Sequence, residues 1–168
     1  PAIRGVSTQA FVNLKLGNLA LRLMDLGYSP HKVMSELAAD DPQFNYRQVG
    51  IVNAENAIAV HTGSNTRSWA GHLTGEGYIV MGNVLAGEEV LQAMAETFEK
   101  QERADLDERL LCSVEAGRDA GGQATADGIH LNERSAAIIT HGHRDFGHID
   151  LRVDANETAV SELRRVHD

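Results

Sequence analysis

The sequence predicts an α+β protein in which helices pack on antiparallel sheets. Three observations lead to this fold class. The predicted helices come in consecutive pairs, the predicted strands follow one another directly as hairpins, and the strand–helix alternation of a parallel sheet is missing. With 168 residues the chain can bury a sizeable apolar core. We therefore expect residues 1–168 to form a single domain.

Two helices are expected near the start of the chain. Between Leu14 and Leu26 leucines recur at steps of three and four residues, and Gly27 follows where a helix needs a left-handed cap. Ser29 and Pro30 are an N-cap followed by a proline of the first helical turn, and Asp41 ends this second helix.

Three strands are expected after the first two helices. Gln48–Asn53 and Ala57–His61 are short β-prone runs joined by a turn, and Tyr78–Met81 is a third run. The intervening segment, Thr62–Gly77, is rich in glycine, serine, threonine and asparagine and is expected to be a loop. We expect functional side chains to gather where these strands end.

In the second half of the chain a pair of helices is again followed by strands. One helix begins near Gly87, and a second runs from Asp105 until Gly117 stops it. Strands are expected over residues 135–140 and 148–153, and the apolar spacing over 160–166 indicates a closing helix.

Charge and hydropathy exclude several classes of partner. The chain has 24 acidic and 15 basic residues and a formal charge of −9, which would repel a nucleic-acid backbone. No apolar run approaches the roughly 20 residues that span a bilayer, so no membrane partner is expected. The single Cys112 cannot form an intramolecular disulfide, which fits a reducing compartment. We therefore expect a cytoplasmic protein.

Two motifs that suggest cofactors depart from the patterns they resemble. Residues 140–146, Thr-His-Gly-His-Arg-Asp-Phe, resemble half of the zinc motif of metallo-β-lactamase-like hydrolases, but Phe146 stands where that motif needs a histidine. His148 could add an imidazole, yet little chain remains for further ligands, so we expect no metal. Residues 82–87 lack the Gly-Lys-Ser/Thr ending of a phosphate loop, so we expect no cofactor.

Residue types capable of chemistry concentrate between the second and third predicted strands. His61 and His72 can move protons, and Asn83 can donate a hydrogen bond to a developing oxyanion. Because His61 and Asn83 each close a predicted strand, and the segment with His72 connects them, we expect these three to line one pocket. For the histidines a structural, hydrogen-bonded imidazole remains the alternative, and for Trp69 core packing. The candidates are His61, Thr62, Ser64, Trp69, His72 and Asn83.

A series of short motifs runs in order along the whole chain. They are Ser7-Thr-Gln-Ala-Phe, Ala59-Val-His-Thr-Gly, Trp69-Ala-Gly-His, Gly82-Asn-Val-Leu-Ala-Gly, Glu108-Arg-Leu-Leu, Ala116-Gly-Arg-Asp-Ala-Gly-Gly, Glu133-Arg-Ser-Ala-Ala and Asp150-Leu-Arg-Val-Asp. Together they resemble the bacterial family of the domain of unknown function numbered one thousand and twenty-eight. That family is grouped with the N-terminal-nucleophile hydrolases by fold.

The resemblance implies a fold, an activity and a set of site residues. The fold would be a four-layer αββα sandwich, and the activity hydrolysis of an amide bond in a small non-peptide molecule. His61 and Asn83 would lie near the reacting carbonyl. The residues that shape the substrate pocket would be Thr8, Gln9, Thr62, Ser64, Trp69 and His72. The family also implies a homodimer, and the alternative is a non-catalytic protein of the same fold that binds a small ligand or a partner.

The resemblance further implies a segment ahead of residue 1. Family members carry their first strands and an N-terminal nucleophile there, and Pro1 offers no nucleophilic side chain. Five predicted strands are also few for so many helices. We therefore expect a preceding segment, cleaved or separate, that supplies the missing strands.

Overall fold

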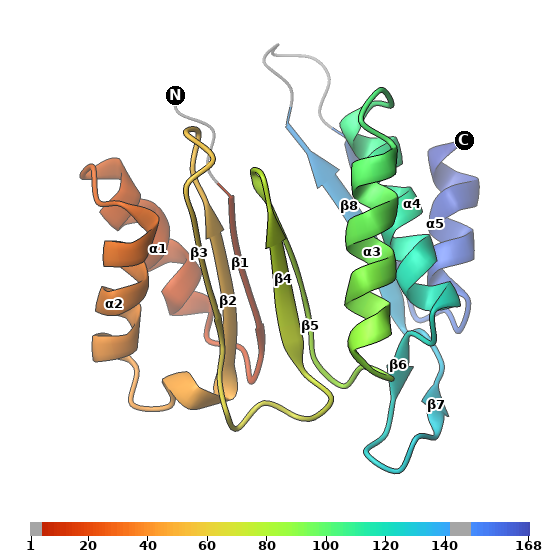
Figure 1. Cartoon of the computed structure of the whole chain (residues 1–168), viewed down its shortest axis with the longest axis horizontal. Coiled ribbons are helices and arrows are strands. Elements are labelled where there is room, and N and C mark those ends of the chain that lie inside the picture. The colour runs from red at the N-terminus through yellow and green to blue at the C-terminus, as the bar shows by residue number, and fades with distance from the viewer. Residues whose placement is uncertain (1–4, 142–148) are drawn as a thin grey trace. The chain divides into compact units, whose positions relative to one another are not determined.

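A computed structural model describes residues 5–141 and 149–168 of the chain. In these residues it contains five α-helices and nine strands, and every strand pair is antiparallel. The predicted α+β class is confirmed. The chain divides into two compact units, Pro1–Val84 and Leu85–Asp168, which Figure 1 shows with their elements labelled.

The first unit is built on five strands. A three-stranded sheet has the order β1 (Gly5–Ala10), β2 (Arg47–Val52) and β3 (Ile58–Thr62). A separate hairpin follows, made of β4 (Gly71–Gly75) and β5 (Tyr78–Gly82).

Two helices cover one face of this sheet, α1 (Leu14–Asp25) and α2 (Pro30–Asp40) (Figure 1). Gly27, with φ of 87°, and the Ser29 side chain, which accepts from Lys32 N, occupy the predicted positions at the helix ends. Burial of apolar surface between the helices and the sheet stabilises the unit. Its core consists of Leu16, Ala20, Met24, Val33, Leu37, Phe44, Val49 and Ile51.

The two faces of β2 contact different layers. Val49 and Ile51 point towards the helices and are fully buried in their core. Gly50 points the other way, and a Cβ atom there would lie 3.2 Å from Ile79 Cδ1 and 3.3 Å from Met81 Sδ. The absence of a side chain at Gly50 therefore lets the β4–β5 hairpin pack closely on the sheet, as a third layer of this unit.

The second unit has three helices and two hairpins. They are α3 (Glu88–Lys100), α4 (Leu106–Asp119), β6 (Gln123–Ala124), β7 (His130–Leu131), β8 (Ser135–Thr140), β9 (Ile149–Asp154) and α5 (Ala159–His167). Leu111, Ile138 and Leu163 bring α4, β8 and α5 into one buried cluster. None of the helices in the described parts of the two units has the length and apolar character needed to cross a bilayer.

Three details differ from the sequence prediction. β1 and β4 were not expected, because their sequences are rich in Gly, Ser, Thr and Gln, and the short β6 and β7 were also missed. Helix α4 continues through Gly117, where the missing side chain makes room for Met94 of α3. The prediction of five strands is thus wrong, and the number of strands no longer argues for a preceding segment.

Candidate functional site

Five polar residues of the first unit converge on the face of the sheet that meets the β4–β5 hairpin. Gln9, Gln48 and Thr62 lie side by side on β1, β2 and β3, since Gln48 pairs with both of the others in the strand register. His72 on β4 and Asn83, just after β5, approach from the hairpin. We call these five residues the Gln48 cluster.

The amide of Gln48 connects the two layers. Its side chain has an exposed fraction of 0%. Nε2 lies within hydrogen-bond distance of three acceptors, Thr62 Oγ1 at 2.8 Å, the Gly71 carbonyl at 2.8 Å and the Gly82 carbonyl at 3.0 Å, and shares its two hydrogens among them. Gly71 and Gly82 are paired across the hairpin, so one buried amide ties the sheet to both strands of the hairpin.

The carbonyl of the same side chain holds two further amides in place. Gln48 Oε1 accepts from Gln9 Nε2 at 2.7 Å and from Asn83 Nδ2 at 3.3 Å. Gln9 Nε2 also donates to the Met81 carbonyl at 3.3 Å. An amide nitrogen carries two hydrogens, so Asn83 retains one N–H and its own carbonyl for other partners.

His72 ends the cluster on its solvent side. Its Nδ1 lies 2.8 Å from Thr62 Oγ1. Because Thr62 Oγ1 already accepts from Gln48, its hydroxyl hydrogen is available to be donated to a neutral imidazole. Burial, and then the charge of nearby His61, lower the pKa of His72, which favours this neutral form at pH 7.

A pocket of about 580 Å³ opens at the end of the strands, beside the Gln48 cluster. Asn83 belongs to both, so the cluster supports one wall of the pocket. We call it the strand-end pocket. Its lining residues are Ala10, Phe11, Gln43, Tyr46, Asn65, Thr66, Arg67, Asn83 and Val84.

Backbone hydrogen bonds fix the loop that contributes Asn65, Thr66 and Arg67 to the pocket. Gly63 N donates to Arg47 O at 2.9 Å, Asn65 N to Asn45 O at 2.9 Å, and Val84 N to Arg67 O at 3.2 Å. A Cβ atom at Gly63 would overlap the Asn45 carbonyl, so this close approach requires glycine. These hydrogen bonds and the close approach at Gly63 hold the loop in place.

Two residues of the pocket wall have a left-handed backbone that non-glycine residues rarely adopt. Ala10 has φ of 70° and Val84 has φ of 57°. For a β-branched residue such as Val84 this conformation is an outlier that costs about 1–3 kcal/mol and tends to occur at ligand sites.

An aromatic pair forms another part of the wall. The rings of Phe11 and Tyr46 meet edge to face with centroids 6.3 Å apart, and Phe11 N donates to Tyr46 O. Behind them the Arg47 guanidinium lies 5.0 Å from the Phe11 ring centroid and donates to the Phe11 carbonyl. Arg47 also forms a buried ion pair with Asp41 at 2.8 Å, and this contact lowers the Asp41 pKa from 3.8 to about 2.

Thr8 and His61 lie on the opposite face of the sheet from the Gln48 cluster. In the strand register both pair with Val49, which points into the helix-covered core. His61 stacks on Phe44 with centroids 4.2 Å apart and donates from Nε2 to the Phe44 carbonyl at 3.1 Å. The expectation that His61 shares a pocket with Asn83 is therefore wrong, because neighbouring residues of a strand face opposite sides.

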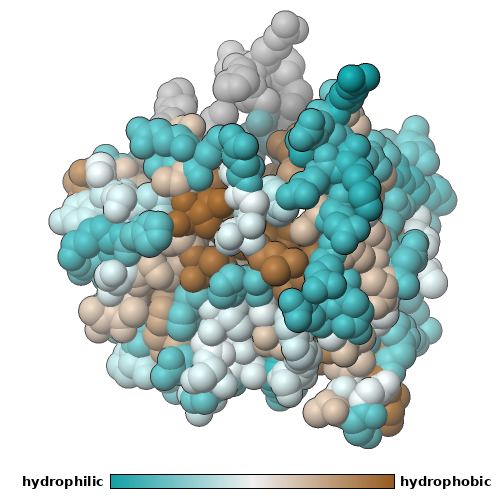
Figure 2. All heavy atoms as spheres, viewed as in Figure 1, coloured by the Kyte–Doolittle hydropathy of each residue, from teal (hydrophilic) through white to brown (hydrophobic). Residues whose placement is uncertain are grey.

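His61 instead lines a separate open groove of about 740 Å³ beside α2 and β3. Met34, Ala38, Ile58 and Val60 supply apolar lining to this groove. Figure 2 shows that most of the viewed face is hydrophilic and that hydrophobic side chains reach the surface over the strands of the first unit.

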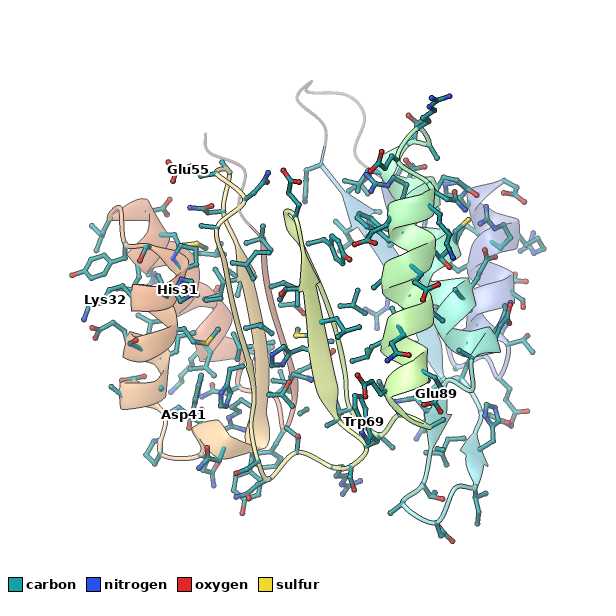
Figure 3. The ribbon with its side chains drawn as sticks, in the orientation of Figure 1. His31, Lys32, Asp41, Glu55, Trp69 and Glu89 are labelled. Atoms are coloured by element: carbon teal, nitrogen blue, oxygen red, sulfur yellow. The ribbon has the colours of Figure 1, made fainter. Side chains whose placement is uncertain are left out.

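The remaining sequence candidates lie outside the strand-end pocket. Ser64 is exposed, and Trp69, labelled in Figure 3 where the hairpin begins, packs its ring against Gly71.

Of the metal candidates, His143 and His148 lie outside the described residues. Within residues 5–141 and 149–168 no three histidine, cysteine or acidic side chains are grouped as a metal site would require.

Sequence reasoning missed Gln48, Phe11, Tyr46 and Arg67. Gln48 left a usable signal, because it directly precedes the apolar run Val49–Val52. If that strand is central in a sheet, the amide is buried and must find hydrogen-bond partners. Phe11 and Arg67 stand singly in loops and Tyr46 ends a three-residue 3-10 helix, so their side-chain directions cannot be deduced from spacing.

The chain is similar to other proteins over nearly its whole length. The model of a family of unknown function, DUF1028, matches residues 2–163. A solved structure of a Silicibacter pomeroyi protein, described as DUF1028, is similar with 25% identity and a TM-score of 0.82, and the match covers 96% of this chain and 70% of that one. No protein with a curated description matches.

Proposed function

This chain belongs to the family of unknown function DUF1028, and we propose that it binds a small molecule in the strand-end pocket and hydrolyses an amide bond in that molecule. The observation that carries the proposal is the Asn83 side chain, which is held on the pocket wall by buried Gln48 and keeps one N–H uncommitted.

Asn83 has the chemistry that amide hydrolysis needs. Attack on an amide carbonyl places negative charge on its oxygen, and a fixed donor stabilises that charge more in the transition state than in the substrate. Arg67 supplies further donors in the same pocket, whereas the Thr66 hydroxyl already donates to the Gly63 carbonyl at 2.7 Å. The proposal gives His61 no catalytic role, and it assigns the nucleophile to no described residue.

The test is a screen of small N-acyl amides with the wild-type protein and with Asn83→Ala. We expect kcat for a hydrolysed amide to fall about 10²–10³-fold in the variant, as when an oxyanion donor is lost. Asn18→Ala is the control, since Asn18 is exposed on α1 and away from the pocket lining. Equal turnover by wild type and Asn83→Ala would contradict the proposed role.

A second function, ligand binding without catalysis, is favoured by the position of His61. The imidazole expected near the reacting carbonyl faces the helices instead, and none of the histidines that the structure describes lines the pocket. Under this alternative a ligand would raise the unfolding temperature of the protein without being consumed. Turnover of that ligand would exclude it.

The family resemblance supports two further proposals. We propose a four-layer αββα arrangement for the complete domain, and we propose that the protein is a homodimer. On α1, Leu14 and Leu26 have exposed fractions of 76% and 74%, and a second copy could bury such apolar surface. Sedimentation at micromolar concentration should give the dimer mass, and a clean monomer would refute the dimer.

A further inference from the structure

We propose that the ligand of the strand-end pocket is an amide-containing carboxylate with a flat apolar group, whose carboxylate pairs with Arg67 and whose flat group packs on the Phe11–Tyr46 pair. This inference rests on the proposed function, since it names the class of molecule that the same pocket takes.

Arg67 is the charged residue of the pocket. Among the described residues, the lining contains one cation and no carboxylate, although the chain as a whole carries a formal charge of −9. Within the described residues the Arg67 guanidinium is without a hydrogen-bond or ion-pair partner. Arg47, by contrast, is buried and donates to Asp41, to Gln43 and to the Phe11 carbonyl. A free guanidinium in an acid-free pocket favours a planar anion that it can bind through two parallel hydrogen bonds.

The backbone presents Arg67 in a fixed place. The hydrogen bonds of Gly63, Asn65 and Val84 hold the loop, so a ligand does not have to order it. Such preorganisation reduces the entropic cost of binding. The backbone therefore places Arg67 on the same pocket as Asn83, and the long side chain can reach a ligand there.

The aromatic pair supplies the second recognition element. Phe11 and Tyr46 have exposed fractions of 63% and 46%, although a backbone hydrogen bond joins the two residues and Arg47 lies against the Phe11 ring. Rings offer a large apolar surface and prefer stacked or edge-to-face partners. A flat group on the ligand would cover this surface, while an amide between the flat group and the carboxylate would lie near Asn83.

Three probes separate these elements; calorimetry measures their affinity, and turnover of each probe is assayed separately so that heat of hydrolysis is not taken for heat of binding. N-benzoylglycine carries the ring, the amide and the carboxylate. N-benzoylglycinamide lacks only the charge, and N-acetylglycine lacks only the ring. We expect N-benzoylglycine to bind at least about tenfold more tightly than either, because a charge-assisted hydrogen bond and a ring contact each contribute on that scale.

Two variants assign the contributions to residues. Arg67→Gln should remove the preference for the acid over its amide, and Tyr46→Ser should remove the preference for the benzoyl over the acetyl compound. Arg22→Gln is the control, because Arg22 is an exposed arginine of α1 outside the pocket.

The outcomes distinguish this inference from the proposed function. Equal affinity for the acid and its amide, a preference that survives Arg67→Gln, or no binding of N-benzoylglycine at millimolar concentration would overturn the inference. Tight, Arg67-dependent binding without turnover would support the inference and contradict hydrolysis. Turnover of uncharged amides with no preference for carboxylates would support hydrolysis and contradict the inference.

Discussion

Replacing Gln48 tests whether one buried amide holds the sheet, the hairpin and the pocket wall together. In Gln48→Leu the volume is nearly conserved, but the donor to the Gly71 and Gly82 carbonyls and the acceptor for Gln9 and Asn83 are both lost. A leucine cannot replace any of these contacts.

The magnitude follows from the groups left without partners. Each buried carbonyl that loses its donor costs about 1–3 kcal/mol. With Gly71 and Gly82 both affected, Gln48→Leu should lower the free energy of unfolding by roughly 2–6 kcal/mol. For a chain of this size that is a fall in Tm of about 3 °C per kcal/mol.

Urea unfolding followed by circular dichroism measures this change. Gln43→Leu is the matched control, since Gln43 is exposed and its side chain makes one bond, to Arg47 at 3.3 Å. It should cost less than about 1 kcal/mol, as most surface substitutions do. A loss for Gln48→Leu no greater than that of the control would refute the reasoning.

A second variant isolates the donor function of Gln48. Gln48→Glu keeps the acceptor oxygens but turns an oxygen towards the Gly71 and Gly82 carbonyls. Protonation of the new carboxyl restores one donor, so the pKa of that carboxyl is raised in the folded state. The difference in free energy of unfolding between wild type and Gln48→Glu should therefore narrow as pH falls from about 7 to 5. A gap independent of pH would show that the amide acts by its shape alone.

Three other predictions concern stability. Arg47 holds the Asp41 pKa at about 2 rather than 3.8, so the pair stabilises the fold above pH 4 by about 2 kcal/mol. This contribution should be lost as pH falls from 4 to 2. The free energy of unfolding measured against pH should show the loss in wild type and not in Asp41→Asn. Gly63→Ala should be destabilising because the added Cβ overlaps a backbone carbonyl. Gly17→Ala, in a helix with room for a methyl group, should stabilise by about 0.5–1 kcal/mol. Thermal unfolding should therefore show a lower Tm for Gly63→Ala and a higher Tm for Gly17→Ala. A hydrogen bond to an aspartate raises the pKa of His167, so its stabilising contribution is present below pH 6.5 and declines as pH rises past the folded pKa; His167→Gln should be less stable than wild type at pH 6 and closer to it at pH 8.

The helices and most strands could be predicted because their signals are local. The leucine spacing of α1, the Ser29–Pro30 start of α2 and the β-prone run of β2 each depend on neighbours in the sequence. β1 could not, because its stability comes from pairing with the distant β2, and β4 could not, because its composition is typical of a loop although it pairs with the adjacent β5.

The candidate site was predicted in part for the same reason. Gln9, Thr62, His72 and Asn83 were selected and do meet, but the prediction did not include Gln48, around which they are arranged. His61 was misplaced because the choice of face within β3 depends on the strand register, which an isolated sequence pattern leaves open.

The position of Gln48 restricts how the pocket can be altered. A change at Asn83 that aims at a new ligand also disturbs the amide that joins the layers, so altered specificity there would come with a loss of stability. Arg67 and Tyr46 lack this link, because both side chains are exposed and outside the Gln48 cluster. Diversification of ligand preference, in the laboratory or among relatives, should therefore be concentrated at the loop and the aromatic wall, with the amides of the strands held constant.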